Sequence, residues 1–220
     1  MAGETRSYDD PCGIARALDA VGERWTLLVV RELLLGAKRF NQLRRGLPGP
    51  SPNVLSQRLR ELEQAGIVRR YQLDPPASVI VYELTERGRE LEPVLIELGR
   101  WGSQAPITSS SELSPDALLV ALKTTFAPTR AGELVASWGL RLDGAQYRIS
   151  VADGRLDIAP GTVTSPSAYL DTDSATLRSV IFGGLPMRDA IADGRLTIDG
   201  PRQAVGRLIR LFPVPARRAG

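Results

Sequence analysis

The stretch that decides the fold runs from Ser51 to Gly66 and reads SPNVLSQRLRELEQAG. It carries the signals of one complete short helix. Ser51 is a favoured N-cap residue, and the proline after it falls in the first turn, where the missing N–H is not needed. Gly66 supplies the left-handed residue that commonly ends a helix. We therefore expect a helix that begins after Ser51 and stops before Gly66.

This helix has two unlike faces. Leu55, Leu59 and Leu62 recur at intervals of four and three residues, so they share one side and are expected to face a core. The residues that gather on the opposite side are Asn53, Ser56, Gln57, Arg60 and Gln64. Asn and Gln can pair two ways with the edge of adenine, and Arg can do so with guanine. The polar face is therefore typical of a helix that reads bases in the major groove of DNA.

The flanking segments predict a winged helix. The expected elements are helices over residues 24–34 and 39–47 before the central helix and strands over residues 67–73 and 79–84 after it. The break Pro48-Gly49-Pro50 turns the chain into the central helix, and the turn cluster Asp74–Ser78 forms the tip of the wing. Three helices and a hairpin thus fit within residues 12–85.

Several motifs, in order along the chain, resemble those of HxlR-type winged-helix transcriptional regulators. They are PCGIARAL at 11–18, GERWTLL at 22–28, RFNQL at 39–43, the helix at 51–66, YELTERG at 82–88 and RWG at 100–102. The resemblance implies a homodimer that binds two-fold symmetric operators in double-stranded DNA and usually represses neighbouring genes. It also implies a dimer contact through the first and last helices of the domain, here about residues 12–22 and 86–104. Trp101 is then expected to be buried against the partner or against the chain's own first helix.

The charge distribution agrees with DNA binding. From Arg31 to Arg70 there are nine basic residues and three acidic ones, although the formal net charge of the whole chain is only +3. Such an excess attracts phosphates. On charge alone a solvated basic surface is the alternative, but the helix and the wing favour DNA. The residues expected to contact DNA are Arg39, Ser51, Asn53, Ser56, Gln57, Arg60, Arg69 and Arg70.

Composition narrows the chemistry. The chain has 220 residues, 43% of them hydrophobic, which is enough for two modest domains. It has no histidine and one cysteine, which excludes His-based catalysis and any zinc site built from several cysteines. We expect no enzyme activity and no cofactor. The lack of a long apolar run and of a signal-peptide core predicts a cytoplasmic protein without a membrane span.

Cys12 lies at the start of the first helix. Some members of the resembled family use a cysteine in this region as a sensor of oxidants or electrophiles. The alternative is that Cys12 is a small apolar residue at a dimer contact. The absence of a second cysteine in the chain favours this alternative.

The second half predicts a separate domain. We expect an N-terminal domain over residues 1–106 and a C-terminal domain over residues 112–215, joined by a polar linker at 107–111. The expected C-terminal elements are helices at 117–126, 173–182, 186–193 and 201–211 and strands at 136–142, 146–151, 155–158, 168–171 and 195–198. Asp143-Gly144 and Asp153-Gly154 are strong signals for hairpin turns. The whole predicts an α+β domain with an antiparallel sheet and helices on one side.

This order resembles the sterol carrier protein type 2 domain. The matching segments are DGRL at 153–156, DTD at 171–173, FGGLPMRDAI at 182–191 and GRLTIDG at 194–200. The resemblance implies an apolar cavity between sheet and helices that accepts a hydrophobic small molecule, with Tyr147, Arg148 or Arg178 as a polar anchor. The expected lining residues are Leu122, Phe126, Trp138, Tyr147, Ile149, Leu177, Ile181, Phe182, Met187, Ile191 and Phe212. Each of these is also a normal core residue, so a closed core is the alternative.

Three hypotheses follow. The first is a repressor that responds to a hydrophobic effector, with the helix at 86–104 linking the dimer contact to the C-terminal domain. The second is a constitutive DNA-binding regulator whose C-terminal domain is structural. The third, from another class, is a lipid carrier or small-molecule enzyme that has acquired a winged helix.

Overall fold

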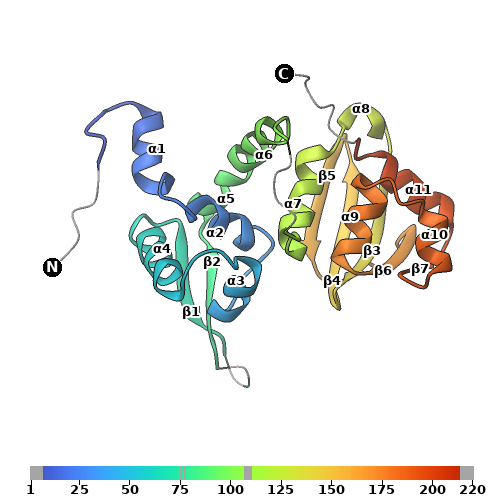
Figure 1. Ribbon diagram of the computed structural model, residues 1–220, viewed down its shortest axis with the longest axis horizontal. Helices are drawn as coiled ribbons and strands as arrows, with labels where there is room; N and C mark the ends of the chain where they lie inside the picture. The colour runs from blue at the N-terminus through green and yellow to red at the C-terminus, as the bar shows by residue number, and fades with distance from the viewer. Residues whose placement is uncertain (1–6, 75, 77, 107–110, 214–220) are drawn as a thin grey trace. The chain divides into compact units, whose positions relative to one another are not determined.

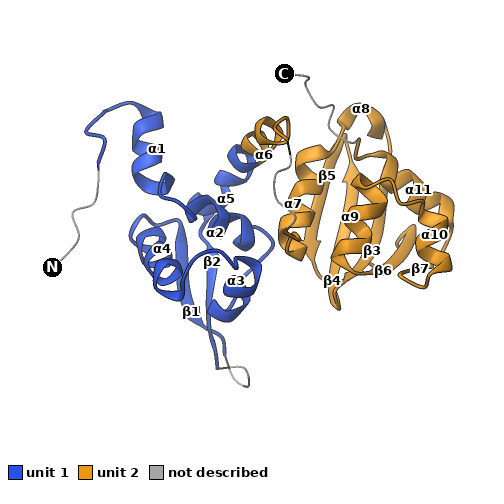
Figure 2. Cartoon of the chain, in the orientation of Figure 1, with its two compact units in different colours: residues 1–95 blue, residues 96–220 orange. Residues whose placement is uncertain are grey.

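The computed structural model describes residues 7–74, 76, 78–106 and 111–213. The chain divides into two compact units, residues 1–95 and residues 96–220 (Figure 2). The dividing point lies inside the helix α6 (Leu91–Gly102), whereas the sequence predicts a boundary after residue 106. Most of the predicted linker, residues 107–110, lies outside the described residues, so the domain boundary stays a prediction.

Unit 1 contains four helices followed by a hairpin and two further helical segments. They are α1 (Gly13–Val21), α2 (Thr26–Leu33), α3 (Phe40–Gly46), α4 (Pro52–Gln64), β1 (Val68–Gln72), β2 (Ile80–Leu84), α5 (Glu86–Arg89) and the first part of α6 (Figure 1). β1 and β2 pair antiparallel, from Val68 opposite Leu84 to Gln72 opposite Ile80. Two residues of the predicted wing tip, 75 and 77, lie outside the described residues.

The ends of α4 are those that the sequence predicts. The Ser51 hydroxyl accepts a hydrogen bond from the backbone N–H of Val54 at 3.3 Å, which satisfies one free donor of the first turn. Gly66 has a φ of +68°, and the N–H of Ile67 reaches back to the carbonyl of Leu62 at 2.9 Å. A left-handed glycine therefore stops the helix.

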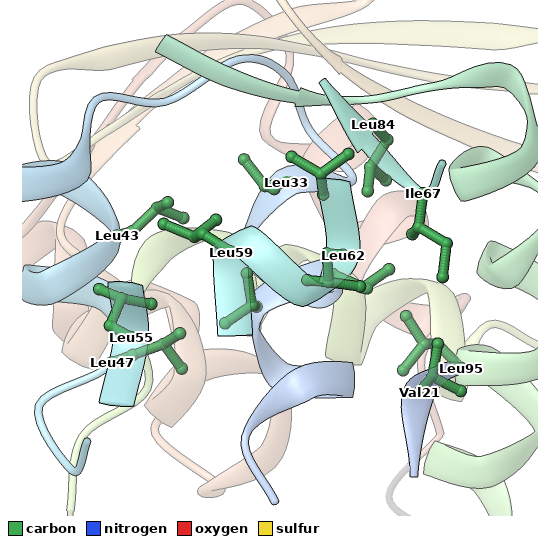
Figure 3. Packing of buried hydrophobic residues seen from close by; sticks show 13 residues of the cluster. Val21, Leu33, Leu43, Leu47, Leu55, Leu59, Leu62, Ile67, Leu84 and Leu95 are labelled. Atoms are coloured by element: carbon green, nitrogen blue, oxygen red, sulfur yellow. The ribbon is translucent and has the colours of Figure 1, made fainter. Parts of the chain in front are cut away.

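The apolar face of α4 forms the centre of the core of unit 1. Leu55, Leu59 and Leu62 are each no more than 1% exposed. They pack in one cluster with residues of α2, α3, β1, β2 and α6, as Figure 3 shows for ten labelled side chains. Burial of a leucine side chain contributes about 1.5–3 kcal/mol. The cluster therefore fixes which side of α4 faces inward.

The predicted helix over residues 86–104 is broken in two at Glu90. Pro93 explains the break, because proline lacks the N–H that an uninterrupted helix would need there and its ring crowds the carbonyl four residues before it. With α6 beginning at Leu91, this proline falls in a first turn, where it is tolerated. A separate cap starts α5, since the Thr85 hydroxyl accepts from the N–H of Gly88 at 3.1 Å.

Unit 2 holds a five-stranded sheet and its helices. Its elements are α7 (Pro115–Thr125), α8 (Pro128–Ala131), β3 (Ala136–Leu142), β4 (Ala145–Ala152), β5 (Arg155–Pro160), β6 (Ala168–Thr172), α9 (Ser174–Phe182), α10 (Met187–Ala192), β7 (Leu196–Asp199) and α11 (Arg202–Arg210). The short α8 is the one helix that the sequence analysis does not predict. Both predicted hairpin turns are confirmed, because the Asp and the Gly of each have positive φ, as a type I′ turn requires.

The sheet is mixed, and the prediction of an antiparallel sheet is wrong in this respect. Its strand order is β5-β4-β3-β6-β7, and β3 and β6 run parallel while the other neighbours are antiparallel. After β5 the chain does not turn back in a hairpin. Residues 161–167 carry it to the far side of β3, where β6 runs in the same direction as β5. A path of this kind leaves no turn signature in the sequence.

One face of this sheet is buried against helices. Trp138, Leu140 and Leu142 of β3 share this face and are at most 2% exposed, whereas Arg141 between the two leucines is exposed. The Trp138 indole N–H donates to the carbonyl of Ala204 in α11 at 3.1 Å, which satisfies its polar group inside the core. The sheet with helices on one side agrees with the predicted α+β class, whereas the likeness to a sterol carrier domain stays a prediction.

We expect the α4 core to be the most sensitive part of unit 1. Leu59→Ala should lower the free energy of unfolding by about 2–5 kcal/mol, because the surrounding helices cannot close the cavity fully. Val54→Ala, on the exposed side of the same helix, is the matched control and should change it by less than about 0.5 kcal/mol. Urea unfolding followed by circular dichroism, with hydrogen exchange of α4 peptides, measures both. Equal losses in the two variants would contradict the packing.

Candidate nucleic-acid interface

The face of α4 opposite the leucines is open to solvent. Asn53, Gln57 and Arg60 are exposed, whereas Ser56 is half-buried. The core fixes this orientation, because turning α4 about its axis would expose its leucines. The structure therefore brings together the three side chains that the sequence predicts to read bases. Ser51 lies at the start of the same helix, with its hydroxyl already accepting a capping hydrogen bond.

A chain of hydrogen bonds runs along this face. Arg60 donates from Nη2 to Oε1 of Gln57 at 2.6 Å, and Gln57 donates from Nε2 to Oε1 of Glu61 at 2.7 Å. These pairs are three and four residues apart, so they lie on adjacent turns. Both ends of the Gln57 amide are thus engaged. The Gln57 amide keeps one N–H and one oxygen lone pair for a base, and Arg60 keeps other N–H donors for guanine.

Several of the cations counted in the sequence are paired with carboxylates. Arg58 is half-buried, with Nη1 2.6 Å from Glu61 and 3.3 Å from Glu23. Arg31 lies 2.8 Å from the buried carboxylate of Glu32. The charge excess counted from residue numbers therefore overstates the positive charge available to phosphates.

Arg69 and Arg70 are neighbours in β1, so their side chains point to opposite faces of the hairpin. Arg69 forms an ion pair with Glu83, and its guanidinium also lies 5.6 Å from the ring centre of Tyr71. The Tyr71 hydroxyl donates to Glu83 at 3.2 Å, and its pKa is raised by loss of solvent and by the Glu83 carboxylate. Arg70 is exposed and has no ion pair within the described part of the chain. Arg70 is therefore the better placed of the two to meet a phosphate.

The short helix α3 contributes further cations. The backbone N–H of Arg39 donates to Oε1 of Gln42 at 2.7 Å, which caps α3, and Arg39 is exposed. Arg44 and Arg45, in the last turn of α3, are also exposed and unpaired within the described residues. They belong to the basic excess in the sequence, but the predicted DNA contacts do not include them. Their position just before the turn into α4 is the sequence signal that would have placed them in the site.

Comparisons with known proteins find relatives among helix-turn-helix regulators. The family model described as HxlR-like helix-turn-helix matches residues 20–109. The HTH-type transcriptional regulator YvaP of Bacillus subtilis is 39% identical over 89 residues, which are 40% of this chain and 82% of that protein. The HTH-type transcriptional regulator sll1512 of Synechocystis sp. is 43% identical over 105 residues, which are 47% of this chain and 76% of that protein.

The chain belongs to the HxlR-like helix-turn-helix family. Among solved structures, the redox regulator HypR in its oxidized form is 35% identical, covers 44% of this chain and all of that chain, and has a TM-score of 0.42. The family match ends at residue 109, so most of unit 2 lies beyond the HxlR-like region.

Two helices, α1 and α6, expose apolar side chains. On α1 they are Ile14 and Leu18, at 73% and 42% exposed, and on α6 they are Val94, Leu98 and Trp101, at 53%, 45% and 74%. Trp101 belongs to unit 2 and α1 to unit 1, so packing of Trp101 against the chain's own first helix stays a prediction. Its burial against a partner subunit stays a prediction.

Cys12 is exposed at the N-cap position of α1. Its backbone N–H donates to Oδ1 of Asp10 at 2.8 Å. Exposure is compatible with both expected roles of the thiol, a sensor of oxidants and a small side chain at a dimer contact. Within the described residues, no group of three His, Cys, Asp or Glu side chains is placed to hold a metal ion.

Most of the residues that the sequence predicts to line a cavity in unit 2 are buried. A void of about 10 Å³ lies between the sheet and the helices, bordered by Leu177 and Ile181 among others. A space of this size holds at most about one water molecule. Of the expected lining residues, the buried ones are Leu122, Phe126, Trp138, Tyr147, Ile149, Leu177, Ile181 and Phe212, and the half-buried ones are Phe182, Met187 and Ile191.

The expected polar anchor Arg148 alternates with buried neighbours in β4, so it lies on the outer face of the sheet. There it pairs with Asp157 at 3.4 Å. Arg178 is exposed on α9.

A groove of about 220 Å³ lies on that outer face instead. The ring of Tyr169 rests against Gly139, where an added Cβ would come within 2.2 Å of it, and the Tyr169 hydroxyl donates to the carbonyl of Val163 at 2.8 Å. Arg141 and Asp171 form an ion pair at the groove, and the hydrogen bond from Arg141 lowers the pKa of the Asp171 carboxyl.

In the described residues, the helices are too short or too polar for any of them to cross a membrane.

Proposed function

We propose that the chain is a homodimeric transcriptional regulator that binds double-stranded DNA through α4. The observation that carries this proposal is the exposed polar face of α4, held outward by three leucines that are no more than 1% exposed. Asn53, Gln57 and Arg60 supply the amide and guanidinium groups that recognise adenine and guanine edges. Family membership supports the same conclusion.

The surrounding cations would hold the protein on the DNA backbone. Arg39, Arg44, Arg45 and Arg70 are exposed and unpaired within the described residues, so they can neutralise phosphates without first breaking an ion pair. Arg69 must loosen its pair with Glu83 to do so. Phosphate contacts position a protein on DNA, whereas base contacts specify the sequence. We propose repression as the outcome, because a bound dimer would block access to promoter DNA.

Arg60 and Arg70 should differ in a way that separates these two roles. Arg60→Ala should weaken binding to a duplex that the wild-type protein selects from random sequences by about 1–3 kcal/mol, and relax preference at one base pair per half-site. Arg70→Ala should weaken all duplexes alike and make the dependence on salt less steep. Fluorescence anisotropy at several salt concentrations measures both effects.

The control for these variants is Arg207→Ala, which removes an exposed arginine of α11 in unit 2. It should leave affinity for either kind of duplex unchanged. Unaltered affinity and preference in Arg60→Ala would show that the reading face is assigned to the wrong residues.

The homodimer is proposed from the exposed apolar stripes. Val94, Leu98 and Trp101 recur at intervals of four and three residues, so they lie along one side of α6. Ile14 and Leu18 form a similar stripe on α1. Apolar stripes of this kind usually mark a protein interface. Two subunits that present their α4 helices roughly 34 Å apart would meet successive turns of the major groove.

We expect the wild-type chain to be a dimer without DNA at micromolar concentration. Leu98→Glu should shift it to monomers, because the carboxylate would have to be buried in the contact. Val135→Glu is the matched control, since Val135 is 77% exposed in unit 2, outside the proposed contact, and this variant should stay dimeric. Light scattering measures the mass, and a monomeric wild-type protein would contradict the proposal.

For unit 2 the small size of the void between the sheet and the helices favours the constitutive regulator over the sensor. A hydrophobic effector would have to separate the helices from the sheet to enter a space of about 10 Å³. The same observation disfavours a lipid carrier. We therefore propose that unit 2 is structural, and the effector-responsive repressor is the hypothesis that the next experiment tests against it.

Addition of fatty acids, sterols or aromatic compounds should leave the melting temperature of the protein unchanged. A ligand that binds only the folded state stabilises it, and the melting temperature rises as the ligand concentration exceeds the Kd. The same panel is added to the titration with the selected duplex, where the affinity should not change. A compound that raises the melting temperature and alters DNA affinity would establish the sensor instead.

A further inference from the structure

Trp25 has an unusual backbone for a large side chain. Its φ of +79° and ψ of −19° place it in the left-handed region, at the N-cap of α2. The other non-glycine residues with positive φ in the described chain are Asp or Ser, which tolerate this region better. Trp25 also makes no side-chain cap for α2, a role that Asn or Ser would fill. The local fold of α2 therefore gives no reason for an indole at this position.

The indole ring contacts the turn that leads into α4. A Cβ built on Gly49 would lie 2.2 Å from Cη2 of Trp25, 2.8 Å from Cζ3 and 3.0 Å from Cζ2. The φ of Gly49 is outside the left-handed region, so its backbone does not require glycine. Glycine is needed there because a Cβ would collide with the edge of the Trp25 ring. Gly49 lies two residues before the Ser51 cap, and the ring thus rests on the segment that sets where α4 begins.

Two neighbours of Trp25 reinforce this contact. The Arg24 guanidinium lies 4.9 Å from the ring centre, within the range of a cation–π interaction. The Glu23 carboxylate lies 3.3 Å from Nη1 of Arg58, in the middle of α4. The segment Glu23–Trp25, which we call the α4 bracket, therefore contacts α4 and the turn before it at two separate points.

The α4 bracket follows α1 directly. α1 ends at Val21, which is buried in the core of unit 1 near Leu95 (Figure 3). Gly22 alone separates it from the bracket, and its N–H donates to the carbonyl of Leu18 at 2.7 Å. The helix whose outer side carries an exposed apolar stripe is thus joined to α4 through Trp25.

We propose that Trp25 is a positioning residue for DNA reading: its ring, seated on Gly49, fixes the start of α4 so that Gln57 and Arg60 meet the bases in register. The proposal rests on the proposed function of α4. The positioning role belongs to the ring and not to the left-handed backbone of the same residue. A displaced α4 would still approach phosphates but would misalign its base contacts, so the ring should govern discrimination between sequences more than general affinity.

The test compares a duplex selected from random sequences by the wild-type protein with a scrambled duplex of the same length. Trp25→Asn keeps a residue that tolerates the left-handed backbone but removes the ring. It should weaken binding to the selected duplex roughly tenfold, the value of about one base contact, and change binding to the scrambled duplex less than about twofold. Trp25→Phe should restore part of the discrimination.

Gly49→Ala approaches the same contact from the other side. The methyl group added by Gly49→Ala should push the ring away. With Trp25 present, it should therefore reduce the ratio of the affinities for the selected and the scrambled duplex. In the Trp25→Asn background the methyl group meets no ring, so the double variant should be no worse than Trp25→Asn alone. Gly206→Ala is the matched control, because its added methyl group would meet only the flexible end of Arg210 at 3.4 Å.

Wild-type discrimination in Trp25→Asn would overturn the proposal, as would equal losses on both duplexes or additive losses in the double variant. Thermal melts by circular dichroism establish that each variant is folded. If Trp25→Asn does not fold, Gly49→Ala decides, since it retains the ring. A wild-type protein that selects no duplex would refute the proposed function itself, which is a different result from the failure of Trp25 to matter.

Discussion

The burial of one leucine face of α4 is the constraint on which the rest of unit 1 depends. Leu55, Leu59 and Leu62 lie in the core, so α4 can present only its opposite side to solvent. The caps at both ends fix its length, and the hairpin starts directly beyond Gly66. The polar face owes its orientation to apolar packing, because its own hydrogen bonds run along the helix and fix nothing about how the helix is turned.

The elements that could be predicted from the sequence are those decided by neighbouring residues. Ser51 and Gly66 bound α4 through local hydrogen bonds and a local φ, and the two Asp-Gly pairs form their turns for the same reason. The parallel pairing of β3 with β6 could not be predicted, because it depends on where residues 161–167 carry the chain. The break at Glu90 could have been predicted from the sequence, since Pro93 is incompatible with an unbroken helix.

The candidate site divides in the same way. Helical periodicity places Asn53, Gln57 and Arg60 on one side of α4 without knowledge of the fold. The pairing of Arg58 with Glu23 joins residues 35 positions apart, and the contact of Trp25 with Gly49 joins residues 24 positions apart. No periodicity encodes such contacts. Cavity volume is equally hidden, because the same large apolar residues can line a pocket or fill it; the void that Leu177 and Ile181 border in unit 2 measures only about 10 Å³.

Attraction to phosphates and recognition of bases require different properties of the cations of unit 1. An arginine that is held by a carboxylate, as Arg58 is by Glu61, keeps its geometry but loses much of its attraction for phosphate. An unpaired arginine such as Arg70 attracts phosphate but has no fixed position. Arg60 lies between these cases, because a neutral amide holds it without cancelling its charge. Base reading needs both a charge and a defined position, and Arg60 has both. The register of Arg60 on the bases then depends on the position of α4, which both the α4 bracket and the leucine core help to set.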